Sequence, residues 1–71
     1  MTCDKIMKLK NFISVYRYKK GFTQYTLAHL IGVSRNTISS LERGEYMPSA
    51  YTAYKLCQVL GVTFEQLFYL E

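Results

Sequence analysis

Four polar side chains able to form several hydrogen bonds lie close together in the middle of the chain: Arg35, Asn36, Ser39 and Ser40. At about 100° of rotation per residue, a helix here presents all four on one face and turns Ile38 and Leu41 to the other. In a DNA major groove, an arginine can donate to both acceptors of guanine, an asparagine can pair with adenine, and a serine hydroxyl suits several bases. The stretch therefore carries side chains suited to reading base edges, with Arg35 and Asn36 as the main candidates.

The position of these side chains favours base reading over the simpler interpretation, an ordinary solvated helix face. Composition alone favours the solvated face, because Arg, Asn and Ser are common on protein surfaces. The segment TQYTLAHLIGVSRNTISSLE, however, has Ala28, Gly32 and Ile38 at the spacing of two short helices that cross closely around a tight turn. Ala28 offers only a methyl group at the crossing, Gly32 can adopt a positive φ, and Ile38 fills the space between the helices. This is the helix-turn-helix pattern, whose second helix enters the major groove.

The remaining elements predict one all-α domain over residues 1–71, with the helix-turn-helix core at 23–44. Apolar periodicity and capping residues predict five helices: about Lys5 to Lys19 with Asp4 as N-cap, Gln24 to about Ile31, Ser34 to about Arg43, Ser49 to Gly61, and a short last helix opened by a Thr63–Gln66 capping box. No strand pattern is visible. Phe12, Tyr16 and Phe64 are expected in the core, whereas Tyr18 and Tyr25 are expected at the surface.

Length and composition limit the possible functions. A chain of 71 residues with 49% apolar residues can form a single small domain. No window approaches the roughly 18 apolar residues of a membrane span, and the N-terminus lacks the apolar run of a secretory signal, so we expect a cytoplasmic protein without a membrane partner. The formal charge of +4 favours a polyanionic partner, but only weakly.

The sequence gives no indication of an enzyme or of a metal site. Cys3 and Cys57 have neither metal-ligand spacing nor a disulfide framework, and we interpret both as free thiols. His29 is the only histidine and is expected at the surface. The serines lack a nearby general base or oxyanion loop. We therefore predict no catalysis, metal, cofactor or small-molecule ligand.

The segment from Thr23 to Ser49, with Arg17 before it and Gly61 after it, resembles the phage repressor and Cro-type (XRE) family of DNA-binding regulators. This resemblance covers nearly the whole chain and implies a compact five-helix, lambda-repressor-like domain. It also implies that Arg35, Asn36 and Ser40 approach bases, and that Gln24, Thr37 and Arg43 bind phosphates. A partly buried, structural ion pair between Arg17 and Glu42 is implied as well.

Contacts to the DNA backbone are expected around the reading helix. A helix N-terminus offers unpaired amide donors and a partial positive charge to phosphates, and Thr23 and Gln24 open the second helix. The expected set of backbone contacts is Thr23, Gln24, Tyr25, Thr37, Arg43 and Tyr46. Lys5, Lys8 and Lys10 are expected on the far side of the first helix, where they contribute only solubility and long-range steering.

Residues 62–71 are a candidate dimerisation segment. Leu67, Phe68, Tyr69 and Leu70 form an apolar run that one short helix cannot bury on a single face. Phe68, Tyr69 and Leu70 are the candidate interface residues, together with the fourth helix, and a short added strand near the end is one possible arrangement. The alternative is that the run folds back on its own core, which fits Leu67 and Phe68 better than the two residues that follow.

Together these features predict a sequence-specific transcriptional regulator that binds double-stranded DNA as a homodimer. A repressor that reads an inverted repeat is the simplest form; an activator or a restriction-modification controller would use the same residues. A different class, an antitoxin or other protein-binding module that also represses its own operon, remains the alternative. A stable homodimer would disfavour that alternative.

Overall fold

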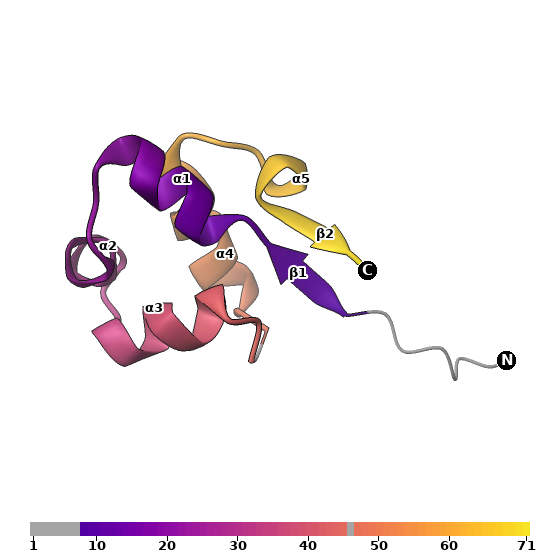
Figure 1. The fold of residues 1–71 in the computed structure, drawn as a ribbon, viewed down its shortest axis with the longest axis horizontal. Helices are drawn as coiled ribbons and strands as arrows, with labels where there is room; N and C mark the ends of the chain where they lie inside the picture. The colour runs from indigo at the N-terminus through magenta and orange to yellow at the C-terminus, as the bar shows by residue number, and fades with distance from the viewer. Residues whose placement is uncertain (1–7, 46) are drawn as a thin grey trace, which may run out of the picture.

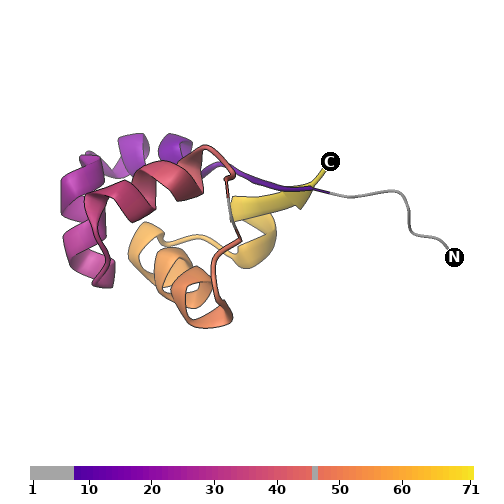
Figure 2. The same ribbon diagram turned by 90° about the horizontal axis from the view of Figure 1, so that it is seen from below.

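The computed structural model describes residues 8–45 and 47–71, which form five helices and a two-stranded sheet. In chain order these are β1 (Leu9–Asn11), α1 (Ile13–Lys20), α2 (Gln24–Ile31), α3 (Arg35–Glu42), α4 (Ala50–Leu60), α5 (Phe64–Leu67) and β2 (Phe68–Leu70). In Figure 1, α1 to α4 gather around one centre, and the two strands lie side by side at the end of the molecule where the C-terminus lies. Figure 2 shows α3 along one side of the molecule and α4 along the other.

The first helix is shorter than predicted, because residues 9–11 form a strand. β1 pairs antiparallel with β2, with Leu9 opposite Leu70. The prediction of a helix over Lys5 to Lys19 is therefore wrong for residues 8–12, and β1 was not foreseen, whereas residues 5–7 lie outside the described part of the chain. Three-residue strands are too short to show an alternating pattern, and β1 exists only because the distant C-terminus supplies its partner. The predicted cap, Asp4, lies outside the described residues.

Asn11 marks the change from strand to helix. Its Oδ1 accepts a hydrogen bond from the backbone N–H of Ile13 at 3.0 Å, which occupies one of the free donors at the start of α1. Its Nδ2 donates to the carbonyl oxygen of Leu41 at 2.8 Å. One side chain thus starts α1 and ties β1 to the end of α3.

The other helices begin where the sequence predicts, because their caps form. Each of four hydroxyl side chains accepts a hydrogen bond from the backbone N–H three residues further on; they belong to Thr23, Ser34, Ser49 and Thr63. In α5 the Gln66 side chain also accepts a hydrogen bond from the Thr63 backbone N–H, so the predicted capping box is present.

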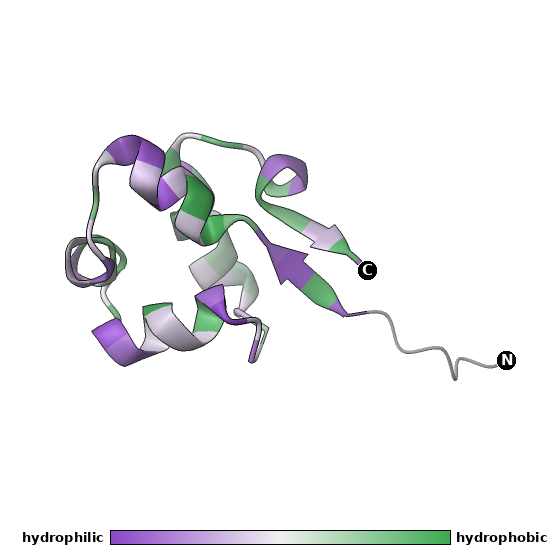
Figure 3. Ribbon diagram, in the orientation of Figure 1, coloured by the Kyte–Doolittle hydropathy of each residue, from purple (hydrophilic) through white to green (hydrophobic). Residues whose placement is uncertain are grey.

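The apolar residues of the helices and of β2 form one core. Its buried members are Ile13, Leu27, Ala28, Ile31, Ile38, Leu41, Ala53, Leu56, Leu60, Leu67 and Phe68. Figure 3 shows the hydrophobic bands of the helices alternating with hydrophilic ones. No helix in the described part of the chain is long and apolar enough to span a membrane.

Two aromatic residues expected in this core lie at its edge instead. Phe12 is 42% exposed and stacks on Tyr69 with ring centroids 4.7 Å apart. Phe64 is 47% exposed and packs against Phe68, with ring centroids 4.8 Å apart. Phe12 directly precedes α1, and Phe64 is the first residue of α5. Both therefore lie where the chain enters a helix, at the edge of the core. Tyr16, by contrast, is half-buried against the core as expected.

The C-terminal run divides between the core and the surface. Leu67 and Phe68 are buried in the chain's own core, so Phe68 is not available at the surface as an interface residue. Tyr69 lies on the face of the sheet opposite the buried Phe68 and is 39% exposed, and Leu70, the last residue of β2, is 59% exposed.

Candidate nucleic-acid interface

A tight turn brings α2 and α3 together. Gly32 adopts φ +79°, and its backbone N–H donates to the carbonyl oxygen of Ala28 at 2.8 Å. Ala28 is buried at the crossing, where its single methyl group allows close approach. The chain then turns through Val33 to Ser34, which caps α3. The small residues singled out in the sequence therefore act as predicted in setting the helix pair.

The α3 helix separates its residues into an inner and an outer face. Ile38 and Leu41 are buried in the core, as the helical spacing predicts. Arg35 and Asn36 are exposed at the N-terminal end of the helix, and Ser39 and Ser40 are half-buried further along. We call Arg35, Asn36, Ser39 and Ser40 the reading face, after the base-reading role that the sequence predicts for them. They are brought together on one helix that protrudes beside α2.

Beneath the reading face lies the ion pair that the resemblance implied. Nε of Arg17 donates to Oε2 of Glu42 at 2.6 Å, and Nη2 donates to Oε1 at 3.3 Å. The two side chains are only 7% and 9% exposed. Nη1 of Arg17 donates to the carbonyl oxygen of Phe22 at 3.0 Å, and the guanidinium lies 4.5 Å from the ring centroid of Tyr18. The hydrogen bond to Glu42 raises the pKa of Arg17, so the guanidinium keeps its positive charge at neutral pH.

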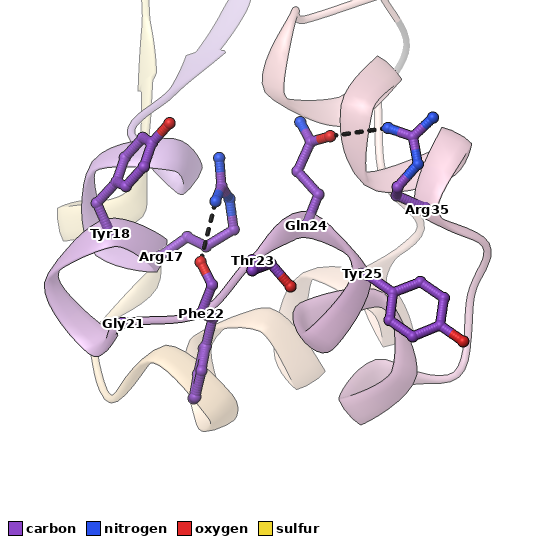
Figure 4. A pocket seen from close by; sticks show the side chains of 8 residues that line it. All are labelled: Arg17, Tyr18, Gly21, Phe22, Thr23, Gln24, Tyr25 and Arg35. Atoms are coloured by element: carbon purple, nitrogen blue, oxygen red, sulfur yellow. Dashed lines mark hydrogen bonds between the residues drawn. The ribbon is translucent and has the colours of Figure 1, made fainter.

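Gln24 connects this buried pair to the reading face, a link that sequence reasoning missed. Its Nε2 donates to Oε1 of Glu42 at 2.9 Å, while its Oε1 accepts from Nη1 of Arg35 at 3.1 Å. Nη2 of Arg35 also donates to Oδ1 of Asn36 at 3.3 Å. Figure 4 shows the Gln24 and Arg35 side chains pointing toward each other, with the hydrogen bond between them as a dashed line. A charged carboxylate accepts from the amide NH₂, so it fixes which end of the Gln24 amide faces Arg35.

A shallow groove of about 720 Å³ runs along the N-terminal end of α2. Figure 4 shows its lining residues: Arg17, Tyr18, Gly21, Phe22, Thr23, Gln24, Tyr25 and Arg35. The expected backbone contacts Thr23, Gln24 and Tyr25 therefore share one surface with Arg35. The first turn of α2 contributes free amide donors and the positive end of its dipole to this groove.

The other expected backbone contacts lie around α3. Thr37 is half-buried, and its hydroxyl lies 2.9 Å from that of the capping residue Ser34. Arg43 is exposed just after the helix and pairs with Glu45. Lys8 and Lys10 were expected far from the site, but β1 places them with Arg43 along a second groove beside the end of α3. Tyr46 lies outside the described residues.

The described residues offer little other chemistry. Among residues 8–45 and 47–71, no three His, Cys, Asp or Glu side chains are grouped so as to hold a metal ion. His29 is exposed on α2. Cys57 is a free thiol whose pKa is raised by partial burial and by the charge of Glu65, which disfavours the nucleophilic thiolate.

Comparison with known proteins adds independent information. Residues 14–67 match the family model described as Helix-turn-helix. A relative named as an uncharacterized HTH-type transcriptional regulator, YgzD of Bacillus subtilis, is 35% identical over 63 residues, which cover 89% of this chain and 96% of that protein. The match with YgzD therefore extends over most of this chain and nearly all of that protein.

Two solved structures share the fold. The restriction-modification controller protein C.AhdI from Aeromonas hydrophila is 31% identical with a TM-score of 0.70, over 76% of this chain and 82% of that one. The N-terminal DNA-binding domain of SinR from Bacillus subtilis is 35% identical with a TM-score of 0.68, over 75% of this chain and 78% of that one. SinR has also been solved in complex with DNA.

Proposed function

The chain belongs to the helix-turn-helix family of phage repressor and Cro-type DNA-binding transcriptional regulators, and we propose that it is a cytoplasmic repressor that reads an inverted-repeat operator as a homodimer. The observation that carries the proposal is the reading face. Its two exposed members, Arg35 and Asn36, stand at the N-terminal end of α3, where a recognition helix meets base edges.

Base reading is assigned to the exposed polar side chains of α3. Arg35 can donate two parallel hydrogen bonds to guanine, and Asn36 can pair with adenine. Gln24 already holds the Arg35 guanidinium at 3.1 Å, so less side-chain freedom is lost on binding. Ser39 and Ser40, further along the helix, would approach the flanking base pairs.

Phosphate binding is assigned to the groove at the start of α2 and to the two ends of α3. The α2 groove combines free backbone amides with Thr23, Gln24 and the exposed Tyr25. Thr37 and Arg43 would contact the backbone on either side of the reading face, and Tyr46 is assigned with them. Contacts of this kind position the protein and make binding salt-dependent without distinguishing sequences.

Homodimerisation is assigned to β2. Lys8 and Glu71 exchange backbone hydrogen bonds at 3.2 and 2.9 Å, so in an antiparallel ladder both backbone groups of Leu70 and the C=O of Phe68 face away from β1 and are offered to a second strand. The N–H of Phe68, by contrast, already donates to the carbonyl oxygen of Phe64. A second β2 placed antiparallel about a two-fold axis at Tyr69 would set Phe68 of one copy opposite Leu70 of the other. The exposed side chains of Tyr69 and Leu70 would then be covered. Such a dimer reads half-sites about 34 Å apart.

Selection of bound duplexes from a random DNA pool tests the proposal. We expect an enriched inverted repeat. On that duplex, Arg35→Ala should weaken binding by about 1 to 3 kcal/mol and relax the preference at one base pair. Arg43→Ala should instead weaken binding to all DNA sequences by a similar factor. Equal losses on all sequences for both variants would refute the assignment of Arg35.

Sedimentation equilibrium tests the dimer separately. Leu70→Lys places a charge on the free edge of β2 and should shift the protein toward monomer. Val15→Lys adds the same charge at an exposed position on α1 and should leave the association unchanged. A wild-type chain that stays monomeric would reject this interface and favour a protein-binding role.

A further inference from the structure

Arg43, which the proposed function assigns to a phosphate, is already held by an acidic neighbour. Its Nε donates to Oε2 of Glu45 at 2.7 Å, and its Nη2 donates to Oε1 at 3.1 Å. Its remaining nitrogen, Nη1, donates to Oγ of Ser39 on the reading face. Each guanidinium nitrogen therefore has an acceptor within the chain. We refer to this arrangement of Arg43, Glu45 and Ser39 as the Arg43 clamp.

The backbone places Glu45 in the clamp independently of the attraction between the charges. Gly44 adopts φ +71°, which turns the chain back over the end of α3. The backbone N–H of Glu45 then donates to the carbonyl oxygen of Ser40 at 3.0 Å. Arg43, with a smaller contribution from Ser40, lowers the pKa of the Glu45 carboxyl, so it carries a full negative charge at neutral pH.

Two lysines lie near the clamp, and one of them, Lys10, is paired with Glu71, whose Oε1 lies 3.7 Å from the lysine Nζ. A groove of about 420 Å³ at the end of α3 is lined by Lys8, Leu9, Lys10, Arg43, Gly44, Glu45 and Met47. Glu45 is the acidic residue of this lining. Arg43 follows Ser39 by four residues, about one helical turn, so it lies on the same side of the chain as Ser39 and the rest of the reading face. The Glu45 carboxylate therefore lies beside the surface that would approach DNA phosphates.

We propose that Glu45 masks Arg43 in the free protein and so weakens the sequence-independent attraction of this domain for DNA. Forming the Arg43–phosphate contact requires the guanidinium to exchange the carboxylate for a phosphate and to release Ser39, whose hydroxyl can then meet a base. The inference rests on the proposed function and adds a residue, Glu45, that lowers DNA affinity.

The exposure of the pair supports masking over a structural role. The side chains of Arg43 and Glu45 are 55% and 54% exposed, and ion pairs in such positions contribute little to folding stability. A phosphate offers the same two-oxygen geometry to a guanidinium as a carboxylate does, so it can replace Glu45 without loss of hydrogen bonds. The carboxylate thus occupies Arg43 in the free protein, and opening the clamp costs little when a phosphate takes its place.

Fluorescence anisotropy with a labelled duplex of unrelated sequence tests the mask across a series of salt concentrations. Because the bound wild type also gains the Arg43–phosphate contact, removing the mask recovers only the cost of opening an exposed ion pair, which is up to about fivefold in affinity. We expect Glu45→Gln to tighten binding by about threefold to fivefold. The same change in an Arg43→Gln background should alter affinity less than twofold. Glu65→Gln, which removes an exposed negative charge on α5, is the matched control for net charge and should have little effect.

The outcomes separate the mask from the proposed function. Equal tightening by Glu45→Gln in both backgrounds would mean simple charge repulsion and would overturn the mask, as would no tightening at all. Either result leaves sequence-specific binding by the wild type intact, which the selected duplex reports in the same assay. A wild type that binds neither duplex would reject the proposed function and the mask with it. Thermal melting of each variant verifies that the fold is retained.

Discussion

Replacing Glu42 by Gln should destabilise the domain severely, although a Gln side chain has nearly the same size and shape as a Glu side chain. In the wild type, three donor nitrogens converge on the two carboxylate oxygens of Glu42: Nε and Nη2 of Arg17 and Nε2 of Gln24. A Gln side chain at position 42 offers one acceptor oxygen and brings an NH₂ group of its own. At least one donor is then left facing another donor, and the buried Arg17 loses its counter-charge.

The magnitude follows from the burial of the pair. Arg17 and Glu42 are 7% and 9% exposed, so water cannot replace the lost carboxylate. Breaking a buried pair by removing one partner costs about 3 to 5 kcal/mol. For a domain of this size, each kcal/mol lowers the melting temperature by roughly 4 to 8 °C, so we expect a fall of at least about 12 °C.

Circular dichroism during thermal and urea unfolding measures the loss. Glu45→Gln, which removes the other arginine–carboxylate pair at an exposed site, serves as the matched control and should leave the melting temperature unchanged. The double variant Arg17→Met with Glu42→Met removes both charges and fills the space with apolar atoms. It should be more stable than either single replacement, because no isolated charge stays buried.

Two results would refute this reasoning. A loss below about 1 kcal/mol for Glu42→Gln would place the pair among exposed ion pairs, contrary to its burial. A double variant whose loss of folding free energy equals the sum of the losses for Arg17→Met alone and Glu42→Met alone would show that Arg17 and Glu42 act independently.

Further predictions concern the turn, the clamp and the thiol. Gly32→Ala should cost about 1 to 2 kcal/mol, because φ is +79° and no atom lies near an added Cβ, so urea unfolding reports backbone strain alone. The ¹⁵Nε resonance of Arg43 should stay constant as pH falls through about 4.3, the ordinary Glu value, and change only at lower pH, because Glu45 has a lowered pKa and keeps its charge until then; a change centred at the ordinary value would show that the clamp is open in solution. In a Cys3→Ser variant, Cys57 in the folded protein should react with iodoacetamide at pH 8 more slowly than it does in the urea-unfolded chain, since folding raises its pKa, and an equal or faster rate would contradict its partial burial.

Within this chain, features governed by near neighbours followed from the sequence. Ser34, Ser49 and Thr63 cap helices because a hydroxyl needs only the amide three residues further on. Gly32 ends α2 because its missing side chain permits a positive φ. The alternation of Ile38 with polar residues likewise set the inner and outer faces of α3, since a regular helix repeats the same rotation at every residue.

Contacts between distant segments were decided only by the tertiary structure. β1 forms where a longer helix was expected because residues 68–70 lie beside it, and a three-residue strand has no stability of its own. Gln24 joins Glu42 to Arg35 because the crossing of α2 and α3 sets the three side chains within hydrogen-bonding distance. Helical periodicity and caps fix only the conformation of neighbouring residues. Which side chains meet across helices depends on how the whole core packs, because the direction of each hydrogen bond is set by the relative positions of two elements.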